Sequence, residues 1–345
     1  MRIAVLGVGL IGGSVGLAAR RRLGAHVAGW DPDPRALRTA EDRGALDVAL
    51  GAPGDATGVD GWVVATPPAA LEEHVRTALA AAGPDAVVTD VGSTKRALVE
   101  AVAERRFIGG HPLAGAETSG VAHAREDLFD GATWYLTPRP DSAGDAYERL
   151  HRLVSALGAV PTAIGHDEHD RVMAAVSHLP HVLANVLVAQ AHAALGGDAM
   201  PATGGSFRDA TRVAGANPGL WAQIYAENAQ ALGAQLDEAI AALAGVRARL
   251  GDLEGWQRRA AEQRRALLEA DSHGGPLAEL RVLVPNRPGV VADLALTLGR
   301  AGINISDMSL APAFDDRSGT VALWVGVGDE ERARALVAGR GLDVA

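Results

Sequence analysis

The stretch Gly7-Val8-Gly9-Leu10-Ile11-Gly12 decides the fold of the first part of the chain. It is a G-x-G-x-x-G pattern that follows an apolar strand, Arg2 to Leu6, and opens a predicted helix, Ser14 to Leu23. In this setting the first glycine permits a tight turn, the second lets a pyrophosphate approach the backbone, and the third allows helix and strand to pack closely. The pattern alone is weak in a chain with 42 glycines, but its context predicts dinucleotide binding.

The second predicted strand, His26 to Trp30, leads into Asp31. A carboxylate at this position accepts hydrogen bonds from both ribose hydroxyls and repels a 2′-phosphate, which favours NAD over NADP. Arg35 and Arg38 follow closely and leave NADP open as an alternative. The predicted cofactor-binding residues of this part are Gly7, Gly9, Leu10, Ile11, Gly12, Asp31 and Thr66.

Strand and helix patterns alternate through residues 1–165. Apolar runs at Val63 to Ala65 and Ala86 to Thr89 predict buried strands followed by helices, and Phe107 to Gly109 and Thr133 to Thr137 predict shorter strands. Repeated strand-turn-helix units predict an α/β fold with a parallel, doubly wound sheet, here a Rossmann domain.

Strand patterns cease near His166, and residues 167–195 and 217–271 have helical patterns. One apolar stripe consists of Leu232, Leu236, Ile240, Leu243, Val246, Leu250 and Leu253. Long alanine-rich helices bury little of themselves in a monomer, so we predict that residues 166–272 form an all-helical domain that pairs in a homodimer. A helical layer packed on its own sheet is the alternative.

Residues 272–276, Ser-His-Gly-Gly-Pro, have the composition of a linker. Beyond it, strands at Leu280 to Val284, Ile303 to Leu310 and Gly319 to Val327 alternate with helices that end at Ala301 and Ala338. We predict a ferredoxin-like β-α-β-β-α-β domain over residues 276–345.

The composition restricts the partners. A formal net charge of −10 argues against general binding to nucleic acid or an anionic membrane, and the absence of cysteine excludes disulfides and thiolate metal sites. The apolar start is short, and no uninterrupted apolar run of about 18 residues follows. We expect a soluble, cytoplasmic protein whose partners are small molecules and other copies of itself.

Residues Gly109 to Glu117 read Gly-Gly-His-Pro-Leu-Ala-Gly-Ala-Glu. A histidine titrates near neutral pH, so His111 beside a nicotinamide ring would accept the proton that leaves a hydroxyl together with a hydride. Ser93 follows a buried strand at the ligand-binding edge of the sheet, where it serves either the site or the N-cap of a helix. Lys95 is the single lysine among 32 Lys and Arg residues, so its compact charge suggests a site role.

Two later stretches carry further chemistry. Ser177-His178-Leu179-Pro180-His181 presents two imidazoles near a helix start, and Gly204 to Arg212 offers guanidinium groups suited to a carboxylate. Asp209 and Arg212 could instead form a surface salt bridge. Histidines and carboxylates also gather at 166–170, but we predict no metal site, because Pro180 disturbs the turn and no downstream cluster completes a coordination shell.

In this order, these motifs resemble the prephenate and arogenate dehydrogenases of tyrosine biosynthesis, the TyrA family. The resemblance covers residues 1 to about 270 and is carried by Gly7–Gly13, Asp90–Lys95, Gly109–Gly120, His169-Asp170, Ser177–His181, and Gly204–Arg212 with Asn217-Pro218 and Trp221. The tail, with Asn286-Arg287-Pro288-Gly289 and Gly302-Ile303-Asn304-Ile305, resembles an ACT domain, a module that binds amino acids for feedback control.

The resemblance implies a role for each matching residue. His111 would bind the substrate's ring hydroxyl with help from Ser93, and Lys95 would lie on the cofactor side. Ser177, His178 and His181 would line the substrate cleft. Arg212 would hold a substrate carboxylate, organised by Glu117 and Asp209, although Ala210 stands where the family usually has an aromatic residue. The regulatory ligand would contact Asn286, Arg287, Pro288, Gly289, Asn304 and Ile305.

The implied activity is an NAD-dependent oxidoreductase reaction at a CH–CH group, the oxidative decarboxylation of prephenate to 4-hydroxyphenylpyruvate. Tyrosine is the implied effector of the ACT domain. Arogenate, which carries an amino group in place of the side-chain keto group, is the alternative substrate, and Glu117 could favour its ammonium. A non-catalytic amino-acid sensor is the alternative from another class.

Overall fold

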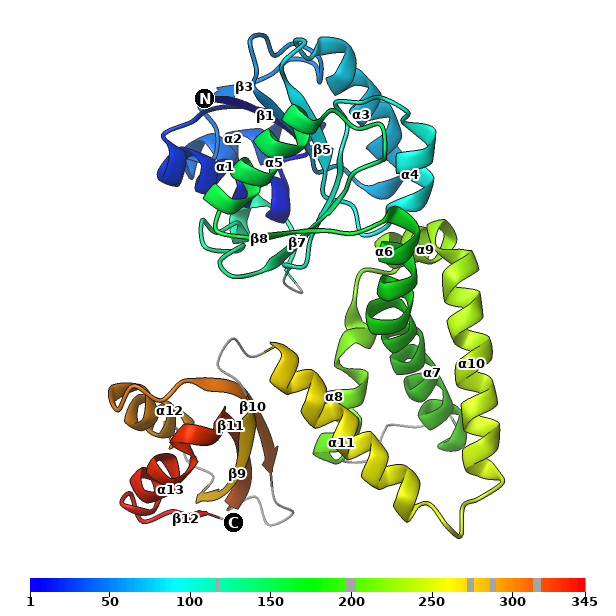
Figure 1. Cartoon of the computed structure of the whole chain (residues 1–345), viewed down its shortest axis with the longest axis vertical. Helices are drawn as coiled ribbons and strands as arrows, with labels where there is room; N and C mark the ends of the chain where they lie inside the picture. The colour runs from blue at the N-terminus through cyan, green and yellow to red at the C-terminus, as the bar shows by residue number, and fades with distance from the viewer. Residues whose placement is uncertain (116–117, 197–202, 272–275, 286–289, 313–317, 345) are drawn as a thin grey trace. The chain divides into compact units, whose positions relative to one another are not determined.

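The structure is a computed structural model that describes residues 1–115, 118–196, 203–271, 276–285, 290–312 and 318–344 (Figure 1). The chain divides into two compact units. The first comprises Met1–Leu183 and Ala214–Ala239, and the second comprises Ala184–Val213 and Ile240–Ala345.

A five-stranded parallel sheet with the order β3-β2-β1-β4-β5 forms the centre of the first unit. Its strands are β1 (Arg2–Leu6), β2 (His26–Trp30), β3 (Val48–Ala49), β4 (Gly61–Val64) and β5 (Val87–Asp90). The predicted α/β class and parallel sheet are confirmed. β1 and β2 match their predicted ranges, whereas β4 and β5 are displaced by one or two residues and β3 was not predicted.

Side chains that alternate along β1 supply two separate cores. Ile3 and Val5 pack in one core with residues of α1 (Leu10–Leu23) and α5 (Gly144–Ala156), while Ala4 and Leu6 pack in the other with residues of α3 (Pro68–Ala81) and α4 (Arg96–Ala101). A period of two is what a strand buried on both faces requires. Helices α1 and α5 therefore cover one face of the sheet, and α3 and α4 cover the other. The short helices α2 (Pro34–Asp42) and η1 (Val121–His123) complete this part of the unit.

His111, the predicted base, lies in a second sheet, which has three strands. β7 (Thr133–Thr137) pairs antiparallel with β6 (Gly109–Pro112) and parallel with β8 (Val160–Ala163). The doubly wound region is thus split into two sheets, and β8 was not predicted. Gly110 lets β6 approach β5, because a Cβ on Gly110 would lie 2.6 Å from the Asp90 carbonyl oxygen.

The helical segment begins with α6 (His166–Met173), the π-helix η2 (Ala174–His178) and α7 (Leu179–Ala194). The remaining helices are α8 (Gly205–Thr211), η3 (Arg212–Gly215), α9 (Pro218–Glu227), α10 (Ala229–Arg247) and α11 (Glu254–Asp271). In the predicted apolar stripe Leu232 is buried, but Ile240, Leu243 and Leu250 are 63%, 61% and 69% exposed. Three of the seven stripe residues are therefore exposed among the described residues, as expected of a surface that a second subunit covers.

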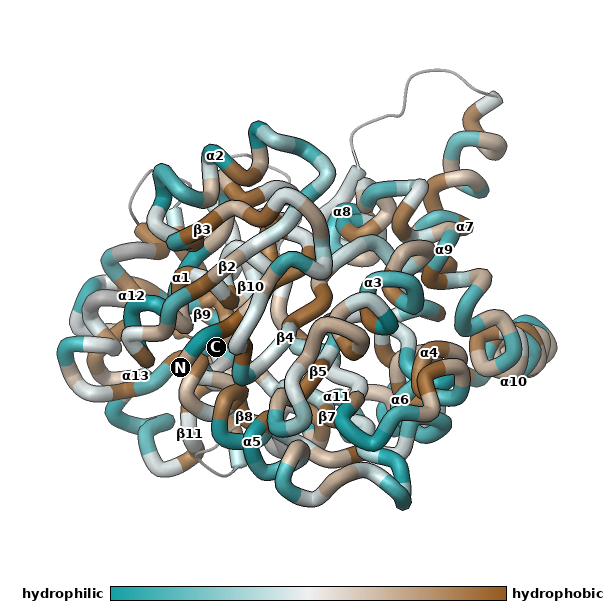
Figure 2. Tube along the Cα trace, turned by 90° about the horizontal axis from the view of Figure 1, so that it is seen from above, coloured by the Kyte–Doolittle hydropathy of each residue, from teal (hydrophilic) through white to brown (hydrophobic). Residues whose placement is uncertain are grey.

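The continuous helix His166–Ala194 is long and apolar enough, by length and composition, to cross a membrane, and 22% of its apolar window is buried. The sequence analysis did not identify this segment, because His178, Pro180 and His181 interrupt its apolar run. Hydrophobic segments recur along α7 in Figure 2, and Val186, Leu187 and Val188 are exposed there. Its first half carries buried imidazoles, described below, which are at odds with a lipid environment.

The C-terminal part of the second unit forms an antiparallel sheet with the order β10-β11-β9-β12. Its elements are β9 (Leu277–Pro285), α12 (Val290–Arg300), β10 (Ile305–Pro312), β11 (Ser318–Gly326), η4 (Val327–Asp329), α13 (Glu330–Ala338) and β12 (Asp343–Val344). Alternate residues of β9, Leu280, Val282 and Val284, pack in one core with Leu294 and Leu298 of α12. The predicted β-α-β-β-α-β order is confirmed.

The close approach of β6 to β5 predicts that Gly110→Ala destabilises the first unit. The added methyl group would overpack a buried site, at a cost of about 1–3 kcal/mol, and should lower the midpoint of thermal unfolding by roughly 2–10 °C. Gly83→Ala is the control, because a Cβ there meets nothing within 4 Å. Equal midpoints for the two variants would contradict the close approach.

Candidate active site

The turn between β1 and α1 forms a cradle that fits a dinucleotide. Gly7 has φ +90°, and a Cβ on it would lie 2.5 Å from the Ala65 carbonyl oxygen, so that position admits only glycine. A Cβ on Gly12 would clash with Gly7, whereas the space above Gly9 is open. Backbone is therefore exposed at the N-terminus of α1, where a pyrophosphate would bind.

Asp31 and Thr66 lie on either side of this turn. The Asp31 carboxylate accepts hydrogen bonds from the Val8 N–H at 2.8 Å and the Asp33 N–H at 2.9 Å. It thereby holds the turn and keeps lone pairs for a ribose. Thr66 is buried, and its hydroxyl lies 3.2 Å from His74 Nδ1. These contacts fit the predicted cofactor roles, which stay predictions.

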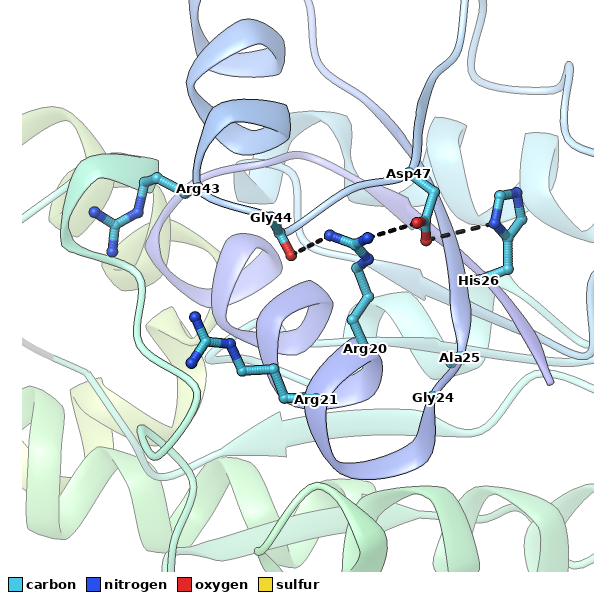
Figure 3. A pocket seen from close by; sticks show the side chains of 8 residues that line it. All are labelled: Arg20, Arg21, Gly24, Ala25, His26, Arg43, Gly44 and Asp47. Atoms are coloured by element: carbon cyan, nitrogen blue, oxygen red, sulfur yellow. Dashed lines mark hydrogen bonds and ion pairs between the residues drawn. The ribbon is translucent and has the colours of Figure 1, made fainter.

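Figure 3 shows a different cavity, of about 540 Å³, at the opposite end of the sheet. It lies where α1 ends and β2 begins, so it is remote from the glycine turn. Arg20 donates to the Gly44 carbonyl oxygen and to Asp47, both at 2.6 Å, and Arg43 donates to the Ala124 carbonyl oxygen at 2.7 Å. Arg20 and Arg43 are thus occupied by hydrogen bonds within the protein, so we do not assign this cavity to the cofactor.

His111 lies on β6 in a row of three hydrogen-bonding groups. Its Nδ1 is 2.9 Å from Nε2 of His169, and Nδ1 of His169 is 2.8 Å from Oδ1 of Asp170. His169 and Asp170 both belong to α6, and all three side chains are buried. His111 was predicted from the sequence as the base, whereas His169 and Asp170 were named only as a stretch that carries the resemblance.

Burial sets the protonation of this row. Desolvation, followed by the nearby His169, Lys95 and His178, holds the pKa of His111 well below its usual value of 6.5. Desolvation also lowers the pKa of His169, although Asp170 opposes that shift. For Asp170, burial raises the pKa, but hydrogen bonds from His169 and from the Arg96 and Lys95 N–H groups outweigh it, and the net pKa is lowered. At neutral pH the row therefore holds two neutral imidazoles and one carboxylate.

Lys95 and Asp90 form a fully buried ion pair beside His111. The two Asp90 oxygens also accept from the Gly92 N–H at 2.8 Å and the Gly110 N–H at 3.0 Å. The single lysine thus neutralises a carboxylate that ties β5 to β6. Lys95 is thus buried and paired in the structure, and its role on the cofactor side stays a prediction.

Asp170 also determines the loop that contains Ser93. Its carboxylate accepts the backbone N–H of Lys95 at 2.8 Å and of Arg96 at 3.0 Å, and so caps the N-terminus of α4. Ser93 is half-buried and is not that cap, which removes the structural alternative considered for it. Thr94, next to it, donates to Glu227 of α9.

The π-helix η2 and the start of α7 carry His178 and His181, the predicted histidine pair, which contact residues of α9 and its C-cap Asn228. Pro180 has no N–H to donate to Val176, four residues earlier, which favours a π-turn at this point. His178 is buried, and its Nδ1 accepts from the Asn228 amide at 3.1 Å. Desolvation lowers the pKa of His178 to about 4, so this ring is neutral.

His181 stacks on Trp221, with ring centroids 3.4 Å apart and planes inclined by 20°. Ser177 is half-buried on the same π-helix. Asn228, which also donates to the Asp170 carbonyl oxygen at 2.8 Å, was not predicted as a site residue. An asparagine at a helix junction has no sequence signal that distinguishes it from an ordinary cap.

The other predicted residues lie elsewhere. Asp209 on α8 and Arg212 in η3 belong to the second unit, where both residues are exposed. Asn304 is exposed before β10, and Ile305 begins that strand. Glu117 and Asn286 to Gly289 lie outside the described residues. The roles of all these residues stay predictions.

A glycine cradle for a dinucleotide, together with a buried, neutral histidine in the same unit, is the combination of a nicotinamide-type oxidoreductase. The chain matches the family models "Prephenate dehydrogenase, nucleotide-binding domain" over residues 15–162, "Prephenate dehydrogenase, dimerization domain" over residues 166–259, and "ACT domain" over residues 278–338. The chain belongs to the prephenate dehydrogenase family. The predicted resemblance, with its C-terminal ACT domain and its family function, is confirmed.

Two curated relatives align with nearly the whole chain. The prephenate dehydrogenase of Bacillus subtilis is 31% identical over 96% of this chain and 94% of its own length. The probable prephenate dehydrogenase NovF of Streptomyces niveus is 32% identical over 96% of this chain and 91% of its own length.

Two solved structures are similar to this chain, and each alignment covers 77% of this chain and 98% of the other. Prephenate dehydrogenase from A. aeolicus, in complex with hydroxyphenyl propionate and NAD+, is 28% identical with a TM-score of 0.72. Synechocystis arogenate dehydrogenase is 26% identical with a TM-score of 0.65.

The lowered histidine pKa values predict a specific pH dependence. His111 must be unprotonated to accept a proton, so kcat/KM should stay level as pH falls to about 6.5 and decline only below it. Because His111, His169 and His178 all have lowered pKa values in the folded protein, the unfolded state binds more protons below about 6.5, and stability should fall there as well. An acidic limb of kcat/KM centred above pH 7 would contradict this assignment.

Proposed function

We propose that the protein oxidises prephenate with NAD and releases 4-hydroxyphenylpyruvate, CO2 and NADH. The observation that carries the proposal is the buried, neutral His111 on β6, where the adjacent Gly110 N–H donates to Asp90 at the carboxyl end of β5. The glycine cradle follows the carboxyl end of β1 in the same parallel sheet as β5. Membership in the prephenate dehydrogenase family supports the substrate. The Asp31 carboxylate and the NAD+ in the complex of the A. aeolicus relative support NAD.

When bound, NAD supplies the hydride acceptor for the hydroxyl-bearing ring carbon, and the decarboxylation that follows makes the substrate ring aromatic. The chain must hold the two reactants in register and remove one proton. His111 Nε2 accepts the hydroxyl proton, and Ser93, at the start of the neighbouring loop, orients that hydroxyl. Positioning contributes several kcal/mol to catalysis, and a general base contributes roughly 10²- to 10⁴-fold in rate.

The substrate cleft would be completed by residues of the helical segment. His178, which accepts from Asn228 through Nδ1, presents an Nε2–H donor, and His181 is held flat against Trp221. Ser177 joins them on the π-helix. Arg212 would bind a substrate carboxylate, with Asp209 and Glu117 organising it, as the resemblance implies.

We further propose a soluble, cytoplasmic homodimer with three domains, at residues 1–165, 166–272 and 276–345. The dimerization-domain match and the exposed side chains of Ile240, Leu243 and Leu250 support the dimer. The ACT match supports a small-molecule effector, for which tyrosine, close in structure to the reaction product, is our candidate.

The variant His111→Asn tests the proposed chemistry. It removes the base but keeps a small polar side chain, so kcat with prephenate should fall about 100-fold or more while NAD affinity stays unchanged. NADH formation followed by absorbance gives kcat, and fluorescence titration gives the affinity. Near wild-type turnover would remove His111 from the mechanism.

The same assay compares prephenate with arogenate. We expect a higher kcat/KM for prephenate, and a preference for arogenate would replace the proposed substrate without changing the role of His111.

Asn304→Ala tests the effector proposal. The side chain is exposed in the ACT domain, so the variant should weaken inhibition by tyrosine and leave uninhibited turnover unchanged. Glu331→Ala, an exposed change on α13, is the matched control and should behave as the wild type does. Full tyrosine sensitivity in Asn304→Ala would exclude Asn304 from the effector site.

A further inference from the structure

The hydrogen-bond partners of Asp170 decide which nitrogen of each histidine carries a proton. Its two oxygens accept the backbone N–H groups of Lys95 and Arg96, so the group acts as a carboxylate and can only accept. His169 Nδ1, 2.8 Å from the same carboxylate, must therefore carry a hydrogen. The opposite tautomer would set a ring lone pair against a negative oxygen.

A neutral His169 with its hydrogen on Nδ1 has a lone pair on Nε2. That nitrogen lies 2.9 Å from Nδ1 of His111, so His111 must donate through Nδ1. The remaining nitrogen of His111, Nε2, is then left with a lone pair. This is the form in which His111 can accept a proton.

We propose that His169 is a positioning residue for the reaction: backed by Asp170, it fixes His111 as the tautomer whose Nε2 is the base. The inference rests on the proposed function. It deepens that function by assigning a task to two buried residues, His169 and Asp170. Carboxylate–histidine pairs orient catalytic imidazoles in other enzymes by the same logic, with a second imidazole interposed here.

The surroundings of His111 give His169 a second task once the proton has arrived. The charged and titratable groups near the ring are the Lys95–Asp90 pair, His178 from η2, and His169 with Asp170 from α6. Desolvation, His169, Lys95 and His178 all disfavour a positive charge on His111. Once His111 is protonated, its Nδ1–H still donates to Nε2 of His169, and the hydrogen bond from His169 to Asp170 keeps that acceptor in place.

The packing of His169 supports a fixed orientation. The side chain is fully buried, and its ring makes edge contacts with His111, at a centroid distance of 5.1 Å, and with Tyr135 of β7, at 5.6 Å. A histidine needed only to fill this space would not require an acceptor aimed at His111. Substitutions of similar volume can therefore separate two roles of His169, filling the buried space and accepting the hydrogen bond from His111 Nδ1.

Two substitutions at His169 in the full-length protein test the proposal. In His169→Gln, the amide oxygen can still accept from His111 Nδ1, whereas His169→Leu fills the space without an acceptor. We expect kcat with prephenate to fall about 10- to 100-fold in His169→Leu, while the KM values for prephenate and for NAD change less than about threefold. His169→Gln should recover most of that loss. His151→Leu, at an exposed position on α5, is the control and should match the wild type.

Each outcome decides the matter. Equal kcat values for His169→Leu and the wild type would overturn the proposal, and so would equal losses in the leucine and glutamine variants, because the acceptor would then be irrelevant. A loss confined to KM would assign His169 to substrate binding and overturn the positioning role. If the wild-type protein forms no NADH from prephenate, the proposed function fails and this inference fails with it.

Discussion

Two buried carboxylates, Asp90 and Asp170, hold the groups of the candidate active site in place. Asp90 ends β5, pairs with Lys95, and accepts N–H groups from the loop before α4 and from β6. Asp170 accepts two N–H groups at the start of α4 and the ring N–H of His169. Breaking a buried pair by removing one partner costs about 3–5 kcal/mol, because the remaining charge is left uncompensated. His111 is therefore positioned by electrostatics as well as by its strand.

This arrangement explains why the chain keeps one lysine among its arginines. The pocket around Asp90 is closed on all sides, and the Lys95 side chain is fully buried. A compact ammonium fits where a planar guanidinium, with five N–H donors to satisfy, would not. The glycines at 109 and 110 have a related cause, since any side chain there would meet Thr137, Thr89 or Asp90.

The sequence allowed the local features of the fold to be predicted. The glycine turn, the parallel sheet and the C-terminal β-α-β-β-α-β unit all follow from patterns within a few residues, and the end of α13 at Ala338 was predicted as observed. The edges of β4 and β5 and the short strand β8 were less accessible, because apolar runs do not mark where strand pairing ends. The π-helix is favoured by the missing N–H of Pro180, whose effect on the hydrogen-bond ladder was noted from the sequence only as a disturbance.

The site residues divide in the same way. His111 and Ser93 stand in recognisable stretches, so they could be singled out from the sequence. His169 and Asp170 were quoted only as a matching stretch, and their link to His111 could not be predicted, because His169 is 58 positions away and only the fold brings the rings together. Lys95 was singled out for its rarity, but its pairing with Asp90 could not be predicted, since composition says nothing about burial. Asn228 joins Asp170 to His178 across the helical segment, a contact that no local pattern encodes.

The central claim is that this buried row gives His111 one defined tautomer before any substrate binds. Two-dimensional ¹H–¹⁵N correlation spectra of the histidine side chains in the full-length protein at neutral pH measure this directly, with His111→Asn used to assign the resonance. The account predicts that His111 is neutral, with a protonated Nδ1 and an unprotonated Nε2. A hydrogen on Nε2, or a doubly protonated ring at neutral pH, would contradict it.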